Sequence, residues 1–124
     1  MIDGARYIHT NLIARDWRAL AAFYGSVFGC VDAPPERDFA SREVEAGTGV
    51  PGAALRGMHM RLPGWGADGP AFAVESVADA RAEVLANGGR AIGDIVTVTT
   101  SRGTVTWCYV TDPEGNIVEL QTWR

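Results

Sequence analysis

The chain has 124 residues, of which 47% are hydrophobic and 21% charged, and its formal net charge is −4. This composition is typical of one globular domain that is long enough to bury a core, and it excludes a disordered chain. Acidic and basic residues are interspersed and form no basic stripe, so a nucleic-acid partner is not expected.

The sequence also indicates in which cellular compartment the protein is expected. Its apolar runs are too short to span a bilayer, and its first residues lack the pattern of a secretion signal. Cys30 and Cys108 are its only cysteines, and we interpret them as free thiols, with one disulfide as the alternative. We therefore expect a soluble cytoplasmic protein with no membrane partner.

The first predicted elements are a strand and a helix. Residues 7–13 are rich in β-formers, and the period of two places His9 and Asn11 on one face. Asp16 is the expected N-cap of a helix over 17–28, whose apolar residues form one continuous stripe that ends at a glycine.

The middle of the chain is less regular. Two prolines and a run of charges over residues 30–51 predict a weak edge strand and a loop. Residues 53–62 predict a strand, and residues 63–70 a turn-rich loop.

The second half repeats the order of the first. Ser76 and Asp79 resemble a capping box, which indicates a helix start. The predicted elements are a strand over 71–77, a helix over 79–87, and strands over 92–99, 104–111 and 116–123, with a tight hairpin at 112–116. Aligning the halves places Asp16 on Asp79 and His9 on Phe72. Because neither unit can bury its own sheet face, we expect them to pair in one α+β domain, residues 1–124.

Three stretches of the sequence resemble one known family. They are residues 9–29, residues 71–89 and, most specifically, DPEGNIVEL at residues 112–120. Together they resemble the vicinal oxygen chelate superfamily, which includes glyoxalase I, methylmalonyl-CoA epimerase, extradiol dioxygenases and the bleomycin- and fosfomycin-resistance proteins. The resemblance implies paired βαβββ modules, about 5–66 and about 70–124, whose sheets form a glyoxalase-like half-barrel with flanking helices. Whether the first module is shortened is left open.

The resemblance also implies a metal site. In the superfamily's enzymes, side chains on the first and last strands of each module bind a divalent metal. His9 matches the first-strand ligand, Glu119 matches the last-strand ligand, and His59 is the third candidate. Two imidazoles and a carboxylate suit zinc, iron, manganese or nickel, and Glu119 would also be the catalytic proton-transfer base. The alternatives to metal binding are that His9 is hydrogen-bonded inside the pocket and that Glu119 faces solvent.

The sequence departs from the enzyme pattern at residues 69–72. The superfamily carries a histidine there, whereas this chain has Gly-Pro-Ala-Phe. In the aligned halves Arg56, not His59, lies opposite Glu119. Arg56 and His59 are an odd number of residues apart, so on a strand their side chains face opposite ways. A deletion after Pro70 would leave His59 on the wrong strand. We therefore expect either a divalent metal ion as the cofactor or no cofactor.

Four further residues are candidates for binding the substrate: Asn11, Gln121, Arg56 and Arg61. The first two would line the pocket, and either arginine would pair with an anionic substrate, with a solvated strand charge as the alternative. Trp107 and Tyr109 alternate with Cys108, and packing in a core or interface is favoured over stacking on a substrate.

Two function classes follow. The first is a metal-dependent lyase, isomerase, epimerase or dioxygenase acting on a small oxygenated metabolite. The second is a metal-free protein that binds or sequesters a small molecule, as the resistance proteins do. The retained His9 and Glu119 favour the first, and the missing histidine near Phe72 favours the second. A shortened first half would leave sheet edges open, so we also expect a homodimer.

Overall fold

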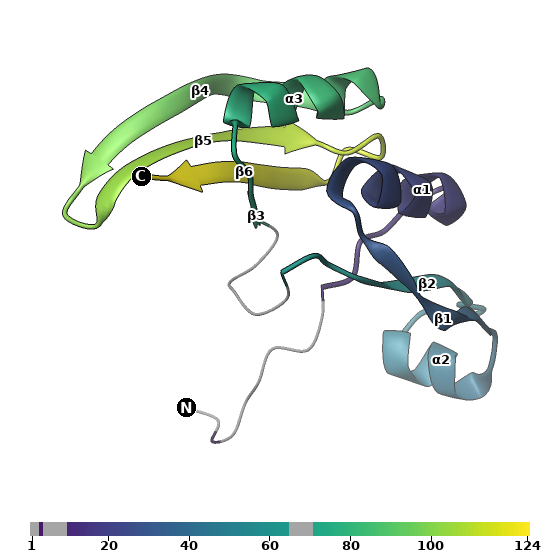
Figure 1. The fold of residues 1–124 in the computed structure, drawn as a ribbon. Coiled ribbons are helices and arrows are strands. Elements are labelled where there is room, and N and C mark those ends of the chain that lie inside the picture. Colours follow the sequence, from purple (N-terminus) through teal and green to yellow (C-terminus); the bar gives the residue numbers. More distant parts are fainter. Residues whose placement is uncertain (1–2, 4–9, 65–70) are drawn as a thin grey trace.

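The computed structural model describes residue 3 and residues 10–64 and 71–124. In chain order the elements are α1 (Trp17–Phe28), β1 (Val31–Phe39), α2 (Arg42–Thr48), β2 (Leu55–Arg61), β3 (Ala71–Ala73), α3 (Val77–Ala86), β4 (Arg90–Thr100), β5 (Gly103–Thr111) and β6 (Ile117–Trp123). Three helices are combined with strands that are mostly antiparallel, which confirms the predicted α+β class (Figure 1).

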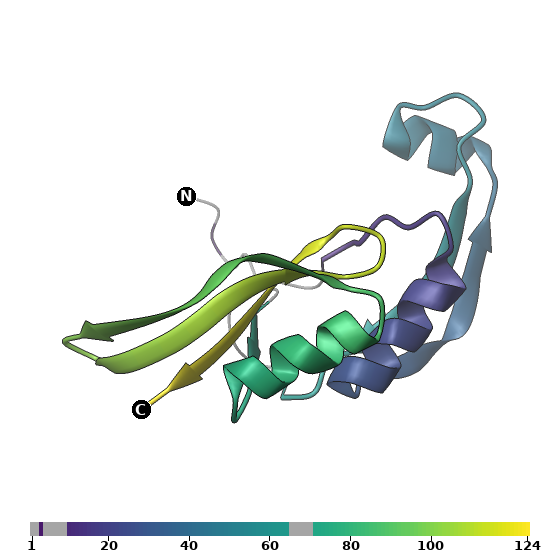
Figure 2. The same cartoon turned by 90° about the horizontal axis from the view of Figure 1, so that it is seen from above.

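The second half of the chain forms a four-stranded sheet with the order β3-β6-β5-β4. β3 runs parallel to β6, and the other neighbours are antiparallel. The helix α3 lies across one face of this sheet (Figures 1 and 2). The order β3-α3-β4-β5-β6 is the βαβββ module that the sequence predicts.

The hydrophobic core lies between α3, α1 and the α3 side of this sheet. Every second residue of β5 and β6 points into it because side chains alternate along a strand. The largest fully buried side chains are Leu120, Val84, Val110, Asp112 and Cys108. From α1, the buried residues Leu20, Phe23 and Tyr24 join the same cluster. Both cysteines are buried and free, as predicted.

The helix α1 has the bounds and caps that the sequence predicts. The Asp16 side chain accepts a hydrogen bond from the Ala19 amide at 3.0 Å, and Gly29 adopts the left-handed conformation at φ 68°. The Phe28 ring stacks on Phe72 with the centroids 4.0 Å apart. This stack joins the first half of the chain to the second.

The first half contains a smaller, two-stranded sheet of β1 and β2, which are antiparallel. Their register shifts between Ala33 and Arg37, at two prolines that have no amide hydrogen to donate to the ladder. Met60 and Leu62 pack against the core. The helix α1 lies between the two sheets, and α2 lies at the far end of β1 and β2 (Figures 1 and 2).

Three predicted elements need correction. Residues 10–13 are not a strand in the structure; strand residues need a neighbouring backbone to bond, and the rest of that predicted strand lies outside the described residues. The predicted loop before residue 51 contains α2, capped by the Ser41 side chain and by Gly49. The strand predicted over 71–77 ends at Ala73, because Ser76 caps α3 and the helix begins at Val77.

Among the helices that the structure describes, none combines the length and the apolar character that a membrane crossing requires.

Candidate functional site

The four-stranded sheet has one face that α3 does not cover. We call it the open face and define it by Ile92, Val96, Val98, Trp107, Tyr109, Ile117, Glu119, Gln121 and Trp123. The register pairs Tyr109 with Glu119 and Trp107 with Gln121, so these four side chains point the same way. Tyr109 is 39% exposed and Trp123 49%, which is high for large apolar side chains on a sheet.

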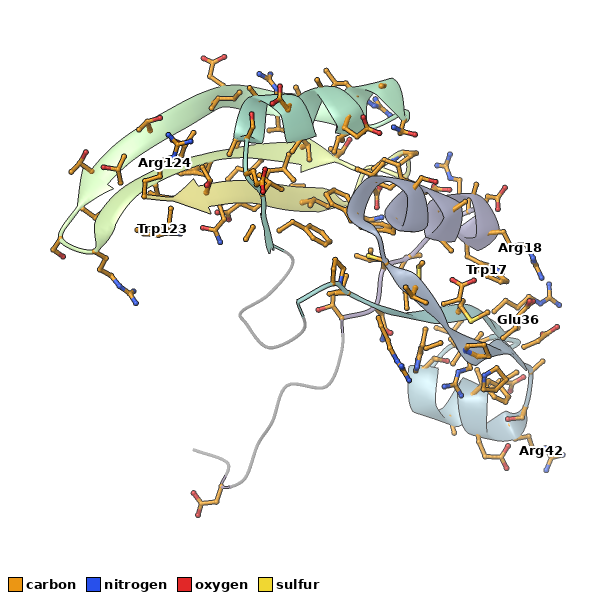
Figure 3. All side chains as sticks on the ribbon, in the orientation of Figure 1. Trp17, Arg18, Glu36, Arg42, Trp123 and Arg124 are labelled. Atoms are coloured by element: carbon orange, nitrogen blue, oxygen red, sulfur yellow. The ribbon has the colours of Figure 1, made fainter. Side chains whose placement is uncertain are left out.

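The aromatic residues of the open face contact each other and the polar side chains. The Trp107 and Tyr109 rings meet edge to face, with centroids 5.2 Å apart and planes at 64°. The Trp123 indole Nε1 donates a hydrogen bond to Gln121 Oε1 at 3.0 Å. Figure 3 shows Trp123 on the side of β6 away from α3. The open face is therefore an aromatic platform with a carboxylate and an amide in it.

Glu119 occupies the middle of this platform. Its neighbours across the strands are Tyr109 on β5 and Ala71 on β3, and the residue is half-buried. Val118 and Leu120 on either side point into the core. The sequence argument placed Glu119 opposite the core on the same grounds, and this orientation is confirmed. A half-buried carboxylate among aromatic rings is suited to accept hydrogen bonds from a ligand.

The predicted metal ligands are not brought together within the described part of the chain. His59 is an exposed residue of β2, on the smaller sheet, whereas Glu119 lies on β6. Over residues 10–64 and 71–124, no three His, Cys, Asp or Glu side chains form a group that could hold a metal. His9 lies outside the described residues. The predicted metal site of His9, His59 and Glu119 therefore stays a prediction.

The four predicted substrate-binding residues separate into two groups. Gln121 lies beside Glu119 on the open face, as expected. Asn11 is exposed in the segment before α1, and both arginines lie on β2. Arg56 donates from Nε to Asp38 Oδ1 at 3.2 Å, whereas Arg61 lies on the same face of β2 as His59.

Sequence reasoning missed a fully buried polar residue that accepts four hydrogen bonds. Asp112, in the turn before β6, is fully buried. It accepts hydrogen bonds from the Tyr24 hydroxyl at 2.9 Å, from the Glu114 amide at 2.9 Å, and from the Asn116 amide and side chain at 2.9 and 2.7 Å. Burial, and then the Asp112 charge, raise the pKa of Tyr24 well above its ordinary value. Asp112 serves the fold, since its four acceptor positions are occupied.

Two of the cavities among the described residues lie away from the open face. One of about 350 Å³ lies between α1 and the turn after β5, where Phe23, Ser26 and Pro113 line it. The other, of about 390 Å³, lies on the α3 side of the sheet and is lined by Thr97, Thr106 and others. Neither contains a predicted site residue. The chemistry therefore points to the open face rather than to these hollows.

A family model described as a glyoxalase-like domain matches residues 9–120. The chain belongs to the glyoxalase-like domain family. This confirms the resemblance to the vicinal oxygen chelate superfamily, and the match includes the positions of both His9 and Glu119. No curated protein matches the chain.

Solved structures of this family share the fold. A glyoxalase family protein from Bacillus cereus has a TM-score of 0.63 at 12% identity, over 99% of each chain. A glyoxalase/bleomycin resistance protein/dioxygenase family enzyme from Burkholderia phytofirmans PsJN has a TM-score of 0.57 at 18% identity, over 93% of this chain and 96% of that one. A glyoxalase/bleomycin resistance protein from Albidiferax ferrireducens T118 has a TM-score of 0.50 at 20% identity, over 87% and 91%. At these identities the likeness establishes the glyoxalase fold.

Proposed function

We propose that this glyoxalase-like protein binds a small, oxygen-bearing aromatic molecule on the open face without a metal. The observation that carries the proposal is the combination of Trp107, Tyr109 and Glu119 on the sheet face that α3 does not cover. The separation of His59 from Glu119 on different sheets supports the metal-free form of the proposal over the metal-dependent one.

The side chains of the open face match the parts of such a ligand. Aromatic rings stack on or meet the edges of Trp and Tyr rings, which contributes about 0.5–1.5 kcal/mol beyond the buried area. The Glu119 carboxylate accepts hydrogen bonds from ligand hydroxyl groups. Two neighbouring hydroxyls on a planar ring, as in catechol, would use both features at once.

The open face needs a cover before it can enclose a ligand. We propose that a second copy of the chain supplies it in a homodimer. Exposed apolar side chains such as Val98 at 42% and Ile117 at 59% are the kind that an interface buries. Light scattering at micromolar concentration tests this, and a monomer would contradict it.

Two ligands serve as probes of binding. Catechol represents the small aromatic diols, and bleomycin is chosen because the names of two fold relatives include bleomycin resistance. Each is titrated into the protein while tryptophan fluorescence is followed, and isothermal calorimetry gives the dissociation constant. Saturable binding of at least one probe is expected, and binding of neither would contradict the proposal.

Matched variants locate the binding. Trp107→Ala should weaken binding at least tenfold, because it removes the platform. Trp17→Ala is the control, since Trp17 lies on α1 with Arg18 over its ring at 4.2 Å, in the other half of the chain (Figure 3). Glu119→Gln keeps the side-chain volume and should weaken catechol binding several-fold. Equal losses in Trp107→Ala and Trp17→Ala would contradict binding on the open face.

A metal-dependent lyase, isomerase or dioxygenase is the second candidate. The family match over residues 9–120 favours it, because His9 and Glu119 both fall within the matched region. Its test is the metal content of protein purified without chelators. A stoichiometric transition metal that is lost in His9→Ala would establish this candidate and replace the metal-free one.

A further inference from the structure

The side-chain amide of Gln121 is held in one orientation by its neighbour on β6. The Trp123 indole Nε1 donates to Gln121 Oε1 at 3.0 Å, and both side chains lie on the open face, since residues two apart on a strand share a face. An indole N–H can only donate, so it meets the amide oxygen and not the amide nitrogen. The contact therefore leaves the NH₂ group of Gln121 for another acceptor.

Two polar groups of the open face have no hydrogen-bond partner within the part of the chain that the structure describes. They are the NH₂ group of Gln121 and the carboxylate of Glu119. Both residues are half-buried. An ionised carboxylate only accepts hydrogen bonds and an amide NH₂ group only donates them. The open face therefore offers a ligand one acceptor and one donor.

This acceptor and this donor are separated along β6. Residues two apart on a strand have Cα atoms about 6.5 Å apart, because a strand rises about 3.2–3.4 Å per residue. Across the sheet, Tyr109 lies opposite Glu119 and Trp107 lies opposite Gln121. The Trp107 and Tyr109 rings contact each other with centroids 5.2 Å apart. A flat ligand that reached both polar groups would therefore lie along this aromatic pair.

The arrangement matches one pattern of groups on an aromatic ligand. Glu119 needs a donor, such as a phenol hydroxyl, and Gln121 needs an acceptor, such as a carbonyl oxygen. Their separation along the strand suits groups at opposite ends of a benzene ring. Catechol has both hydroxyls at one end, so it can use Glu119 and the aromatic rings but leaves the Gln121 NH₂ group without an acceptor.

We propose that Gln121, oriented by Trp123, makes the open face select para-hydroxyphenyl carbonyl compounds over phenols that lack the carbonyl. Glu119 accepts from the phenol hydroxyl and Gln121 donates to the carbonyl oxygen, while the ring lies against Trp107 and Tyr109. Trp123 is a positioning residue, because without its N–H the Gln121 amide can rotate and present either end. This selection rests on the function proposed above, since it uses the same face.

The test compares two ligands of nearly the same shape by isothermal calorimetry on the intact protein. Para-hydroxyacetophenone carries the hydroxyl and the carbonyl, whereas para-ethylphenol carries the hydroxyl alone. Catechol is titrated beside them as the reference for binding to the open face. The wild-type protein should bind para-hydroxyacetophenone more tightly than para-ethylphenol. The ratio of the two dissociation constants measures the selection.

Two variants should reduce this ratio by different routes. Gln121→Met keeps a similar side-chain volume without the NH₂ group, and the ratio should fall at least threefold, as expected for one lost hydrogen bond. Trp123→Phe keeps an aromatic ring without the N–H, and the ratio should fall at least twofold. Trp17→Phe, on α1, is the control and should leave the ratio unchanged. Far-ultraviolet circular dichroism checks that each variant is folded.

The outcomes separate this selection from the proposed function. Equal affinity of the two ligands in the wild type, or a preference that survives in Gln121→Met, would overturn the selection. Binding of catechol but of neither para-substituted ligand would also overturn it, and the open face would remain the proposed binding site. Binding of none of the three ligands would contradict both proposals.

Discussion

The smaller sheet of this glyoxalase-like protein has strands of 9 and 7 residues and the larger sheet has strands of 3 to 11 residues, and only the larger sheet encloses a core. In the second half, α3 crosses the sheet and buries Val84 against Cys108 and Leu120. In the segment from Val31 to Arg61, no residue is buried. The difference shows that a sheet encloses a core only where its strands present alternating apolar side chains to a helix.

The sequences of the two regions explain this difference. β5 and β6 alternate apolar core residues with the residues of the open face. β1 contains two prolines and four charged residues, DAPPERD, and α2 has only seven residues. A helix of this length, with no buried residue, cannot act as the second layer.

The largest expected difference is in the response to truncation. Leu120→Ala removes a fully buried side chain of β6 and should lower the free energy of unfolding by about 2–5 kcal/mol. Leu55→Ala, at the start of β2 where the side chain is 51% exposed, should cost about 0.5 kcal/mol or less. Urea unfolding measures both. Similar losses would contradict the contrast between the two sheets.

A second pair of variants compares a buried carboxylate with an exposed one. Asp112→Asn places an NH₂ group against donors that the carboxylate accepts from, and should cost about 2–3 kcal/mol. Asp38→Asn breaks the exposed pair with Arg56 and should cost less than about 1 kcal/mol. Thermal unfolding at pH 7 compares them, and the account fails if Asp38→Asn is the more destabilising.

Alkaline pH should lower the stability of the folded protein through three titratable groups in its core. Burial raises the pKa of Tyr24 above its ordinary 10.0, and burial raises the pKa of the Cys30 and Cys108 thiols above 9.0. The folded protein then holds protons that the unfolded chain releases. Stability is therefore unaffected by these groups below about pH 9 and falls above it, with a limiting slope of about 1.4 kcal/mol per pH unit from Tyr24. Tyr24→Phe should flatten the decline above pH 10 in urea unfolding, and an unchanged slope would be evidence against this cause.

The sequence predicts best where local signals and packing agree. The bounds of α1 follow from Asp16 and Gly29, which cap it, and from the apolar stripe between them. The turn after β5 follows from Pro113 and Gly115. The missed helix α2 had its caps, Ser41 and Gly49, but its charges without an apolar stripe also fit a loop.

The candidate site was predicted less completely, and the reason is distance along the chain. The alternation of β6 is enough to place Glu119 and Gln121 on one face. The contact of Tyr24 with Asp112 joins residues 88 positions apart, and no local pattern reports it. The position of His59 depends on strand pairing in the middle of the chain, where the register shift at the prolines cannot be derived from periodicity.

The most direct test of the proposed function is to map catechol binding by amide chemical shifts on the assigned protein. The largest shifts should fall at Trp107, Tyr109, Glu119 and Gln121 on the open face. Residues on the α3 side of the same strands, such as Thr106 beside the cavity of about 390 Å³, should shift little. Shifts centred on that cavity or on Phe23 and Ser26, with the open face unchanged, would contradict the account.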